Sequence, residues 1–428
     1  MLKRFGICMG GILIAVGLVF EHISGSDEAV KILEQEEMTV SEFVMNGVIE
    51  ENKGEKAAEE VETLEIDDEP RIETINLVSV GDIMMHSDEI NCGYDRGTGT
   101  YQYDFMFEEV KPYLAAGDIT IGNLEFTMAG KEKGYSGYPM FNAPSEMADA
   151  MKEAGIDVLS TANNHSLDRH YEGVSHTIDV LDHRGLMHTG TYKTKEETSQ
   201  ILYMTVKDTK FAFLSYTYGT NGIKADKGKE FCVNYIDKDK IKADIEKARN
   251  GGGEVICVSI HWGVEYVTKP NKEQENLADF LIQNGADIIL GGHPHVLEPM
   301  EIRRTNFNGK EKDVVLLYSQ GNFISGQRDR YKDTGAIFNI FLEKNFETGA
   351  ISVQNVSYIP TWVDQKNVKG QTMYRVLAAK RSIHMYETKQ DGDISKNDYE
   401  RLKRSLTDAR SILKGNDPRI GEMLTYAD

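Results

Sequence analysis

A series of short apolar stretches, each ending in glycine, asparagine or histidine, is the feature that most constrains the fold of this chain. Six of them are predicted to be β-strands, because they are five to eleven residues long and rich in β-branched residues. Segments with helical periodicity separate several of these strands, which is typical of an α/β protein with a largely parallel sheet. The predicted strands are 75–80, 118–125, 157–165, 254–263, 286–290 and 313–323, and the predicted helices are 145–154, 171–184, 238–250 and 272–284.

The fifth stretch, residues 286–295 (ADIILGGHPH), carries the clearest indication of chemistry. His293 and His295 directly follow its apolar part and the break at Gly291-Gly292. In open α/β sheets, ligands bind at the carboxyl ends of the strands. Two neutral imidazoles so close together suit a divalent transition metal. The alternative is a turn with two solvated histidines.

Other predicted strands end in side chains of the same chemical type. The first ends in Asp82 and His86, the second in Glu125, the third in Asn164 and His165, and the fourth in His261. Five strands therefore bring carboxylate, amide and imidazole groups to one edge of the sheet, enough to bind two metal ions with a bridging carboxylate. For a single strand-end histidine, a structural role would be the better interpretation. The remaining histidines lack this placement and are predicted to lie at the surface: His170, His176, His183, His188 and His384.

The amino-terminal part of the chain has a different character. Lys3 and Arg4 precede sixteen uncharged residues, 5–20, which favours an uncleaved membrane anchor over a cleaved signal and places the downstream domain outside the cytoplasm. Residues 26–70 hold 16 acidic side chains against 3 lysines, so we expect a solvated, flexible linker.

Charge and cysteine content exclude some functions. The chain has 428 residues and a formal net charge of −21, without a cluster of Lys and Arg, which argues against a nucleic-acid partner. None of the four cysteines has CxxC spacing, so neither a zinc ribbon nor a redox pair is indicated, and Cys257 is expected to be a packing residue.

Six ordered motifs between residues 78 and 326 resemble the CapA-type family of poly-γ-glutamate capsule biosynthesis proteins. The resemblance covers most of residues 72–365. That family is itself similar to the calcineurin-like metallophosphoesterases, so the resemblance implies a four-layer α/β/β/α sandwich. The motifs are GDIMMH, GNLEF, TANNHSLD, SIHWGVEY, GGHPHVLEP and YSQGNFIS.

The resemblance also implies roles for individual residues. Asp82, His86 and His295 would bind one divalent metal (Mn, Fe or Zn), and Asn164, His261 and His293 would bind the second. Glu125 would bridge the two, and His165 would act as the catalytic acid. Two departures from the metallophosphoesterase pattern stand out: three residues separate Asp82 from His86 instead of one, and Glu125 replaces an aspartate. Candidate pocket walls are Tyr216, Tyr218, Asn221, Tyr266 and Asn322.

Two functions remain open from the sequence. The first is a metal-dependent hydrolase acting on a phosphoester, on poly-γ-glutamate or on another anionic polymer. The second is a non-catalytic polymer-binding or transport component of a capsule synthesis complex that contains other capsule synthesis proteins. Four regions are predicted: an anchor or signal at 1–24, a linker at 25–70, the main domain at 71–365 and a helical extension at 366–428.

Overall fold

Two β-sheets form the centre of the protein in a computed structural model that describes residues 70–368 and 370–423. The larger sheet is mixed, with β1, β4, β5 and β6 parallel and β14, β15 and β16 antiparallel to their neighbours. In the order of the sheet, its strands are β16 (Gln371–Ala378), β15 (Ile351–Val368), β14 (Thr334–Asn345), β1 (Ile72–Ile83), β4 (Ile119–Leu124), β5 (Val158–Ser160) and β6 (Met187–Thr189); β13 (Asn322–Ile324) pairs with β1, and β17 (Ile420–Glu422) pairs with β15.

The smaller sheet has four parallel strands in its centre, with an antiparallel strand at each edge. Its strands, in order, are β11 (Met300–Phe307), β12 (Lys310–Leu317), β10 (Ile288–Gly292), β9 (Val255–His261), β8 (Thr209–Thr217) and β7 (Leu202–Val206). A separate two-stranded ribbon is formed by β2 (Tyr94–Asp95) and β3 (Thr100–Tyr101).

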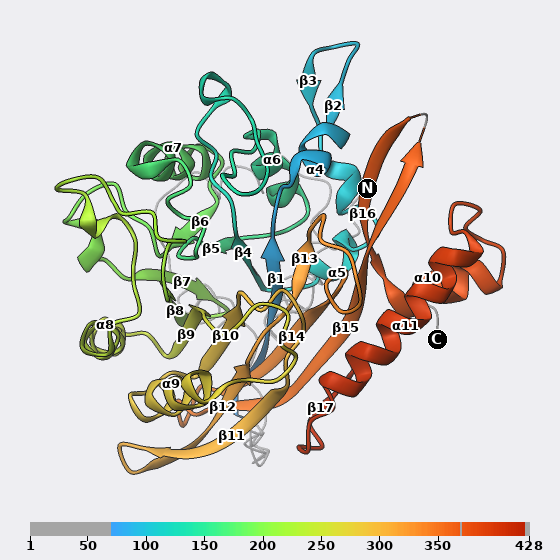
Figure 1. The fold of residues 1–428 in the computed structure, drawn as a ribbon. Helices are drawn as coiled ribbons and strands as arrows, with labels where there is room; N and C mark the ends of the chain where they lie inside the picture. The colour runs from blue at the N-terminus through green and yellow to red at the C-terminus, as the bar shows by residue number, and fades with distance from the viewer. Residues whose placement is uncertain (1–69, 369, 424–428) are drawn as a thin grey trace, which may run out of the picture. The chain divides into compact units, whose positions relative to one another are not determined.

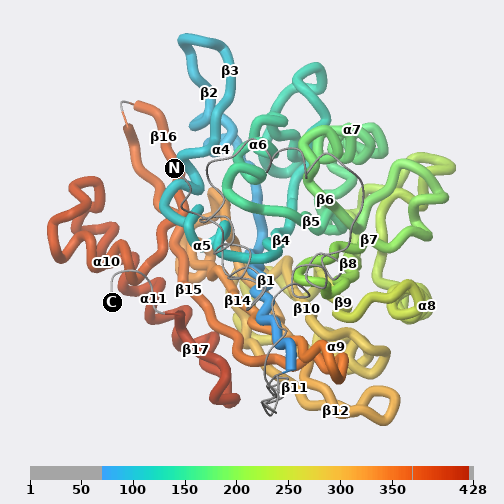
Figure 2. The backbone as a smooth tube through the Cα atoms, turned by 180° about the vertical axis from the view of Figure 1, so that it is seen from behind, coloured from blue at the N-terminus to red at the C-terminus, as the bar shows by residue number. Residues whose placement is uncertain are grey.

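Helices cover the outer face of each sheet (Figures 1 and 2). Helices α4 to α7 contribute to the core outside the larger sheet, and α8 and α9 pack outside the smaller one, while α10 and α11 pack against β15. The helices are α4 (Ser87–Cys92), α5 (Lys111–Leu114), α6 (Glu146–Glu153), α7 (His170–His183), α8 (Lys238–Asn250), α9 (Lys272–Gln283), α10 (Ala379–Glu387) and α11 (Lys396–Ile412).

Three of the five buried apolar clusters of the described residues hold these layers together. The central core lies between the two sheets and includes Leu77 of β1, Phe338 of β14 and Phe213 of β8, all fully buried. Alternate residues of the same strands face the helices; Ile256 and Val258, for example, pack with α8 and α9 while Cys257 faces the other sheet. This alternation makes every central strand apolar on both sides, as the sequence indicates. The predicted α/β class is confirmed, and Cys257 is a packing residue.

Two predicted elements were wrong in detail. The stretch 313–323 is two strands: β12 lies in the smaller sheet, and β13 pairs with β1 of the larger one. Residues 318–321 cross from the smaller sheet to the larger one, and apolar periodicity does not indicate such a change of sheet. The predicted boundary at 365/366 falls inside β15, and β16 continues the same sheet because Tyr374 and Val376 alternate into its core, so helical structure begins only at Ala379.

The predicted membrane anchor and almost all of the acidic linker lie outside the described residues. Within residues 70–368 and 370–423, no helix is long and apolar enough to cross a bilayer.

Candidate metal centre

The carboxyl ends of strands from both sheets meet at one edge of the sandwich. Strands β1, β4 and β5 of the larger sheet end beside β9 and β10 of the smaller one. The side chains at these ends are buried although they are polar, since none is more than 4% exposed; they are Asp82, Glu125, Asn164, His165, His261, His293 and His295.

Gly292 permits the close approach of the two sheets at this edge, and Gly291 permits close packing within the smaller sheet. A Cβ atom on Gly291 would lie 1.9 Å from the Tyr318 carbonyl oxygen, and one on Gly292 would lie 2.8 Å from Asp82 Oδ1. The next residues depart from ordinary backbone geometry, because His293 has a φ of 97° and His295 a φ of 56°. Such left-handed conformations in residues other than glycine cost about 1–3 kcal/mol and cluster at functional sites.

Two carboxylates form the floor of the site. Asp82 Oδ1 accepts a hydrogen bond from Asn123 Nδ2 at 2.8 Å, and the same amide donates to Glu125 Oε2 at 3.2 Å. Asp82 Oδ2 accepts from the backbone N–H of His293 at 3.2 Å. Glu125 Oε1 is buried and has no hydrogen-bond partner. A carboxylate oxygen left unpaired in this way is costly unless a cation or a proton satisfies it.

Imidazole nitrogens surround the unpaired oxygen. His261 Nε2 lies 3.6 Å from Glu125 Oε1, and His295 Nε2 lies 3.7 Å from the same atom. The His293 ring centroid is 4.9 Å from that of His261, and His293 Nδ1 is also buried without a partner. His295 Nδ1 is shared between Asp82 Oδ2 at 3.2 Å and Asn322 Oδ1 at 3.1 Å, which fixes the direction of its Nε2 atom.

Burial sets the protonation of these groups. It lowers the pKa of His261 far below its usual value and that of His293 to about 3, with the neighbouring His295 acting in the same direction. Both rings are therefore neutral at pH 7, the form that donates a lone pair to a metal. Burial, together with the charge of Asp82, raises the pKa of Glu125 well above its usual value. Burial alone would raise the pKa of Asp82, but hydrogen bonds from His295 and Asn123 lower it on balance.

Three overlapping sets of side chains could each hold a metal ion, with ligand atoms within 4.8 Å of one another. In the part of the chain that the structure describes, they are Asp82, Glu125 and His295; Glu125, His261 and His293; and Glu265, His293 and His295. Glu125 belongs to the first two sets. The amide oxygen of Asn164 adjoins the second set, at 2.9 Å from His261 Nε2. The donor set of nitrogen and oxygen atoms fits Mn, Fe or Zn.

His165 lies at the edge of this cluster with a fixed ring. Its Nδ1 is 2.8 Å from Asp168 Oδ2, and Asp168 is fully buried and also accepts from the Phe141 backbone N–H at 2.7 Å. On the opposite side, Asn221 Nδ2 is 3.5 Å from His165 Nε2, while Asn221 Oδ1 accepts from Asn164 Nδ2 at 3.2 Å. The Nε2 atom of His165 is therefore directed toward Asn221, which also bonds to Asn164.

Most of the predicted pocket walls lie at the site. The Tyr218 ring is 4.6 Å from the His293 ring, and the Tyr266 ring is 6.1 Å from the His295 ring, both measured between centroids. Asn221 and Asn322 contact His165 and His295 as described above. The structure places Tyr216 elsewhere: it is fully buried in the core between β8 and the outer helices, and its hydroxyl donates to Asp244 Oδ2 at 2.8 Å.

The structure also leaves His86 outside the three sets. His86 precedes α4, and its Nδ1 lies 3.6 Å from Glu89 Oε1 and 3.3 Å from the backbone N–H of Gly326. The three residues between Asp82 and His86 account for this displacement, because they lead the chain away from the end of β1 and into α4.

Three residues of the site were missed by the sequence analysis. Asp168 follows His165 at a spacing of three, which could have identified it as the partner of that ring. Glu265 lies in the SIHWGVEY motif, four residues beyond His261. Asn123, in the GNLEF motif, bonds to both buried carboxylates, but nothing in its spacing distinguishes it from a turn residue.

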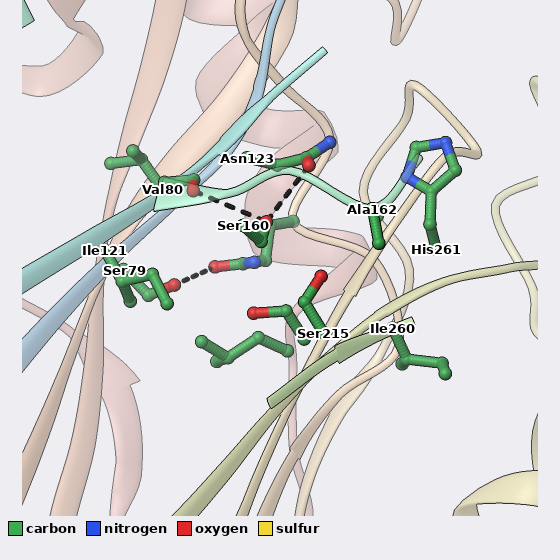
Figure 3. Close-up of a pocket in the computed structure, with 14 residues that line it drawn as sticks. Ser79, Val80, Ile121, Asn123, Ser160, Ala162, Ser215, Ile260 and His261 are labelled. Carbon is green, nitrogen blue, oxygen red and sulfur yellow. Dashed lines mark hydrogen bonds between the residues drawn. The ribbon is translucent and has the colours of Figure 1, made fainter. Parts of the chain in front are cut away.

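A small polar cavity lies between the two sheets next to His261 (Figure 3). Its volume of about 10 Å³ is near the minimum that holds one water molecule. Ser160 Oγ donates to Asn123 Oδ1 at 3.0 Å, and Ser79 Oγ donates to Gln320 Oε1 at 2.5 Å on the other side. The cavity thus continues the polar character of the site into the space between the sheets.

The fold and the cluster define an α/β protein with a buried carboxylate–histidine centre at the carboxyl ends of two sheets. The sequence profile of the family described as "Bacterial capsule synthesis protein PGA_cap" matches residues 76–327, and the chain belongs to this family. The resemblance to capsule biosynthesis proteins is therefore confirmed.

Curated relatives agree with this assignment. The chain is 32% identical over 276 residues to the capsule biosynthesis protein CapA of Bacillus anthracis, covering 62% of this chain and 63% of that protein, which is less than two thirds of its length. It is 30% identical over 306 residues to the PGA biosynthesis protein CapA of Bacillus subtilis (strain 168), covering 70% and 76%.

The solved structures similar to this one are more distant. A calcineurin-like phosphoesterase, YfkN of Bacillus subtilis, aligns with a TM-score of 0.39 and 15% identity over 78% of this chain and 100% of that one.

Proposed function

We propose that this protein is a metal-dependent hydrolase of poly-γ-glutamate capsule biosynthesis, with a dinuclear site of the metallophosphoesterase type. The single observation that carries the proposal is the unpaired Glu125 Oε1 atom, fully buried among the Nε2 atoms of His261 and His295. Cations bound beside Glu125 would satisfy this oxygen. The family membership supports the role in capsule biosynthesis.

The positions of the residues suggest which of them would bind each of two metal ions. Asp82 and His295 would bind one ion, and His261, His293 and the Asn164 amide oxygen would bind the other, with Glu125 between them. Glu265, which is exposed beside His293 and His295, is a candidate additional ligand at the solvent side. His86 could join the first ion only if its ring moved from its contacts with Glu89 and Gly326.

Metal ions held by these residues would supply Lewis-acid chemistry, which activates water and stabilises the negative charge that develops on the attacked group. His165 is the residue placed to transfer a proton to the leaving group. Asp168 Oδ2 lies 2.8 Å from His165 Nδ1 and would accept its N–H, which would leave Nε2, beside Asn221, as the nitrogen that exchanges a proton with the substrate. Tyr218 and Tyr266 border the site and would limit the access of water.

The decisive experiment combines metal analysis with two hydrolysis assays, one of the phosphoester bis-p-nitrophenyl phosphate and one of the amide polymer poly-γ-glutamate. We expect about two divalent ions for each wild-type chain and measurable hydrolysis. The variant His165→Ala should keep its metal while the rate falls by about 10² to 10⁴. The variant His293→Ala should lose metal. His183→Ala is the matched control, because His183 is exposed at the end of α7.

The competing function, a non-catalytic component that binds or transports the polymer, predicts another result. In that case the metal-loaded wild-type protein would hydrolyse neither substrate, and His165→Ala would support normal capsule production in cells. That combination would refute the hydrolase.

We further propose that residues 5–20 anchor the protein in the cell membrane in a single pass, with the main domain extracytoplasmic. The support is the sequence pattern of Lys3 and Arg4 before an uncharged stretch. Membrane fractionation with protease accessibility tests the topology, and a mature protein that starts beyond residue 20 would contradict the anchor. Poly-γ-glutamate or another anionic polymer, a phosphoester substrate and other capsule synthesis proteins are the proposed partners.

A further inference from the structure

A second pocket lies beside the metal centre, on the helix side of the smaller sheet. Its volume is about 450 Å³, within the range that holds small organic ligands. Tyr218 belongs to both sites, because its ring packs against His293 at 4.6 Å and also lines the pocket. Trp262, the residue after His261, lines it as well. The two sites therefore adjoin at Tyr218.

Apolar side chains form part of the wall. Ile236 precedes α8, Leu277 lies on α9, and both face the pocket together with the rings of Tyr218 and Trp262. Leu277 and Trp262 are buried at 8% and 3% exposure, so they belong to a fixed wall. Such a surface binds a branched or linear hydrocarbon group by excluding water.

Two charged side chains without ion-pair partners line the remaining part of the pocket wall. Within residues 70–368 and 370–423, neither Lys238 at the start of α8 nor Glu273 in the first turn of α9 forms an ion pair, although other charged residues nearby do, such as Lys272 with Glu275. Lys238 Nζ instead lies 5.1 Å from the centroid of the Phe280 ring. The pocket therefore offers one ammonium and one carboxylate for a ligand.

The side-chain amide of Gln274, which also lines the pocket, already has hydrogen-bond partners within the protein. Gln274 accepts from the Asn271 backbone N–H at 2.9 Å and donates to Glu298 at 2.6 Å, so its orientation is fixed. It closes the back of the pocket and leaves Lys238, Glu273 and Asn276 as the groups free to recognise a ligand.

We infer that this pocket binds the non-reacting part of the substrate, and that this part is an N-acylated amino acid with an apolar side chain. Its carboxylate pairs with Lys238, its amide N–H donates to Glu273, and its side chain packs on Ile236 and Leu277. The assignment of the pocket to the substrate rests on the proposed hydrolase. The binding chemistry does not, because it uses no group of the metal centre other than the Tyr218 ring.

Titration of the full chain by ligand-observed NMR tests the inference with three probes. N-acetylleucine carries all three features, N-acetylleucinamide lacks the carboxylate, and 4-methylpentanoate lacks the N–H. We expect N-acetylleucine to bind tightest, by about tenfold over each of the other two, the usual value of one hydrogen bond to a charged group. Binding should persist in the presence of a chelator.

Single substitutions in the pocket test each proposed contact between the ligand and the protein. Lys238→Gln should weaken N-acetylleucine about tenfold and leave N-acetylleucinamide unchanged, whereas Glu273→Ala should weaken N-acetylleucine and leave 4-methylpentanoate unchanged. Asn276→Trp should fill the pocket and abolish binding of all three. Lys272→Trp is the matched control, on the same helix but outside the pocket lining, and should bind as the wild type does.

Three results would overturn the inference. The first is equal weakening of N-acetylleucine and its amide by Lys238→Gln. The second is unchanged binding in Asn276→Trp. The third is loss of binding on chelation, which would place the carboxylate at the metal centre. If the protein binds the probes in this pattern, but the metal-loaded protein hydrolyses neither bis-p-nitrophenyl phosphate nor poly-γ-glutamate and His165→Ala supports normal capsule production, the proposed hydrolase is refuted and the ligand class of the pocket stands.

Discussion

Glu298 provides a test of the electrostatics of the fold that is independent of catalysis. It follows β10 and the histidine turn, and its side chain is 1% exposed. Its Oε2 atom accepts from Gln274 Nε2 at 2.6 Å, and its Oε1 atom is buried without a partner. Burial raises the pKa of Glu298 to about 7 from 4.5, although the bond from Gln274 acts in the opposite direction.

The raised pKa of Glu298 determines how this residue changes the free energy of unfolding with pH. Because the folded protein binds the proton more tightly than the unfolded chain, the stabilisation is complete at pH values below the unfolded pKa of 4.5 and is lost as the pH rises through about 7. The loss at pH 8 is about 3 kcal/mol, since each pKa unit corresponds to about 1.4 kcal/mol. Glu298→Gln keeps the acceptor for Gln274 but cannot ionise. It should therefore equal the wild type near pH 4.5 and exceed it by about 3 kcal/mol at pH 8.

Thermal unfolding in the presence of a chelator measures the difference in stability between Glu298→Gln and the wild type. For a folded region of about 350 residues, about 3 kcal/mol corresponds to a Tm difference of about 4 °C at pH 8. Glu108→Gln is the control, because Glu108 is exposed and its removal should change Tm equally at both pH values. If Glu298→Gln gave the same Tm difference at pH 4.5 and pH 8, the carboxyl would not titrate in the expected range, and the reasoning would fail.

The strands and helices of the centre could be predicted because their apolar pattern is strong. The predicted helix 238–250 coincides with α8, and 272–284 differs from α9 by one residue at its end. The split of 313–323 could not be predicted, because Val315 and Phe323 are both buried and apolar although they belong to different sheets. Which sheet a strand joins is decided by long-range packing that a local pattern does not contain.

The convergence of the site residues followed from a single rule, that parallel strands end at the same edge. That rule brings Glu125 and His261 together although they come from different sheets. It fails where the chain has left the strand, as at His86, or where a residue lies on the other face, as at Tyr216. The left-handed backbone at His293 also could not be predicted, since it is imposed by the tertiary contacts of the turn.

Three further predictions test the site and the core. Asp168→Asn should leave metal content unchanged and lower kcat by about 10- to 100-fold, because the amide no longer fixes the tautomer of His165; steady-state kinetics with metal analysis measures both. Phe338→Ala should destabilise the central core by about 3–5 kcal/mol in urea unfolding, and a loss below about 1 kcal/mol would contradict its place between the sheets. Gly292→Ala should weaken metal binding by at least about tenfold in a competition with a chelator. Its Cβ would lie 2.8 Å from Asp82 Oδ1, and Asp82 cannot yield freely because Asn123 and the His293 backbone N–H hold it. Gly421→Ala, where a Cβ meets no atom within 4 Å, is the control; equal metal affinity in both variants would show that Asp82 does not need its present position to bind the ion.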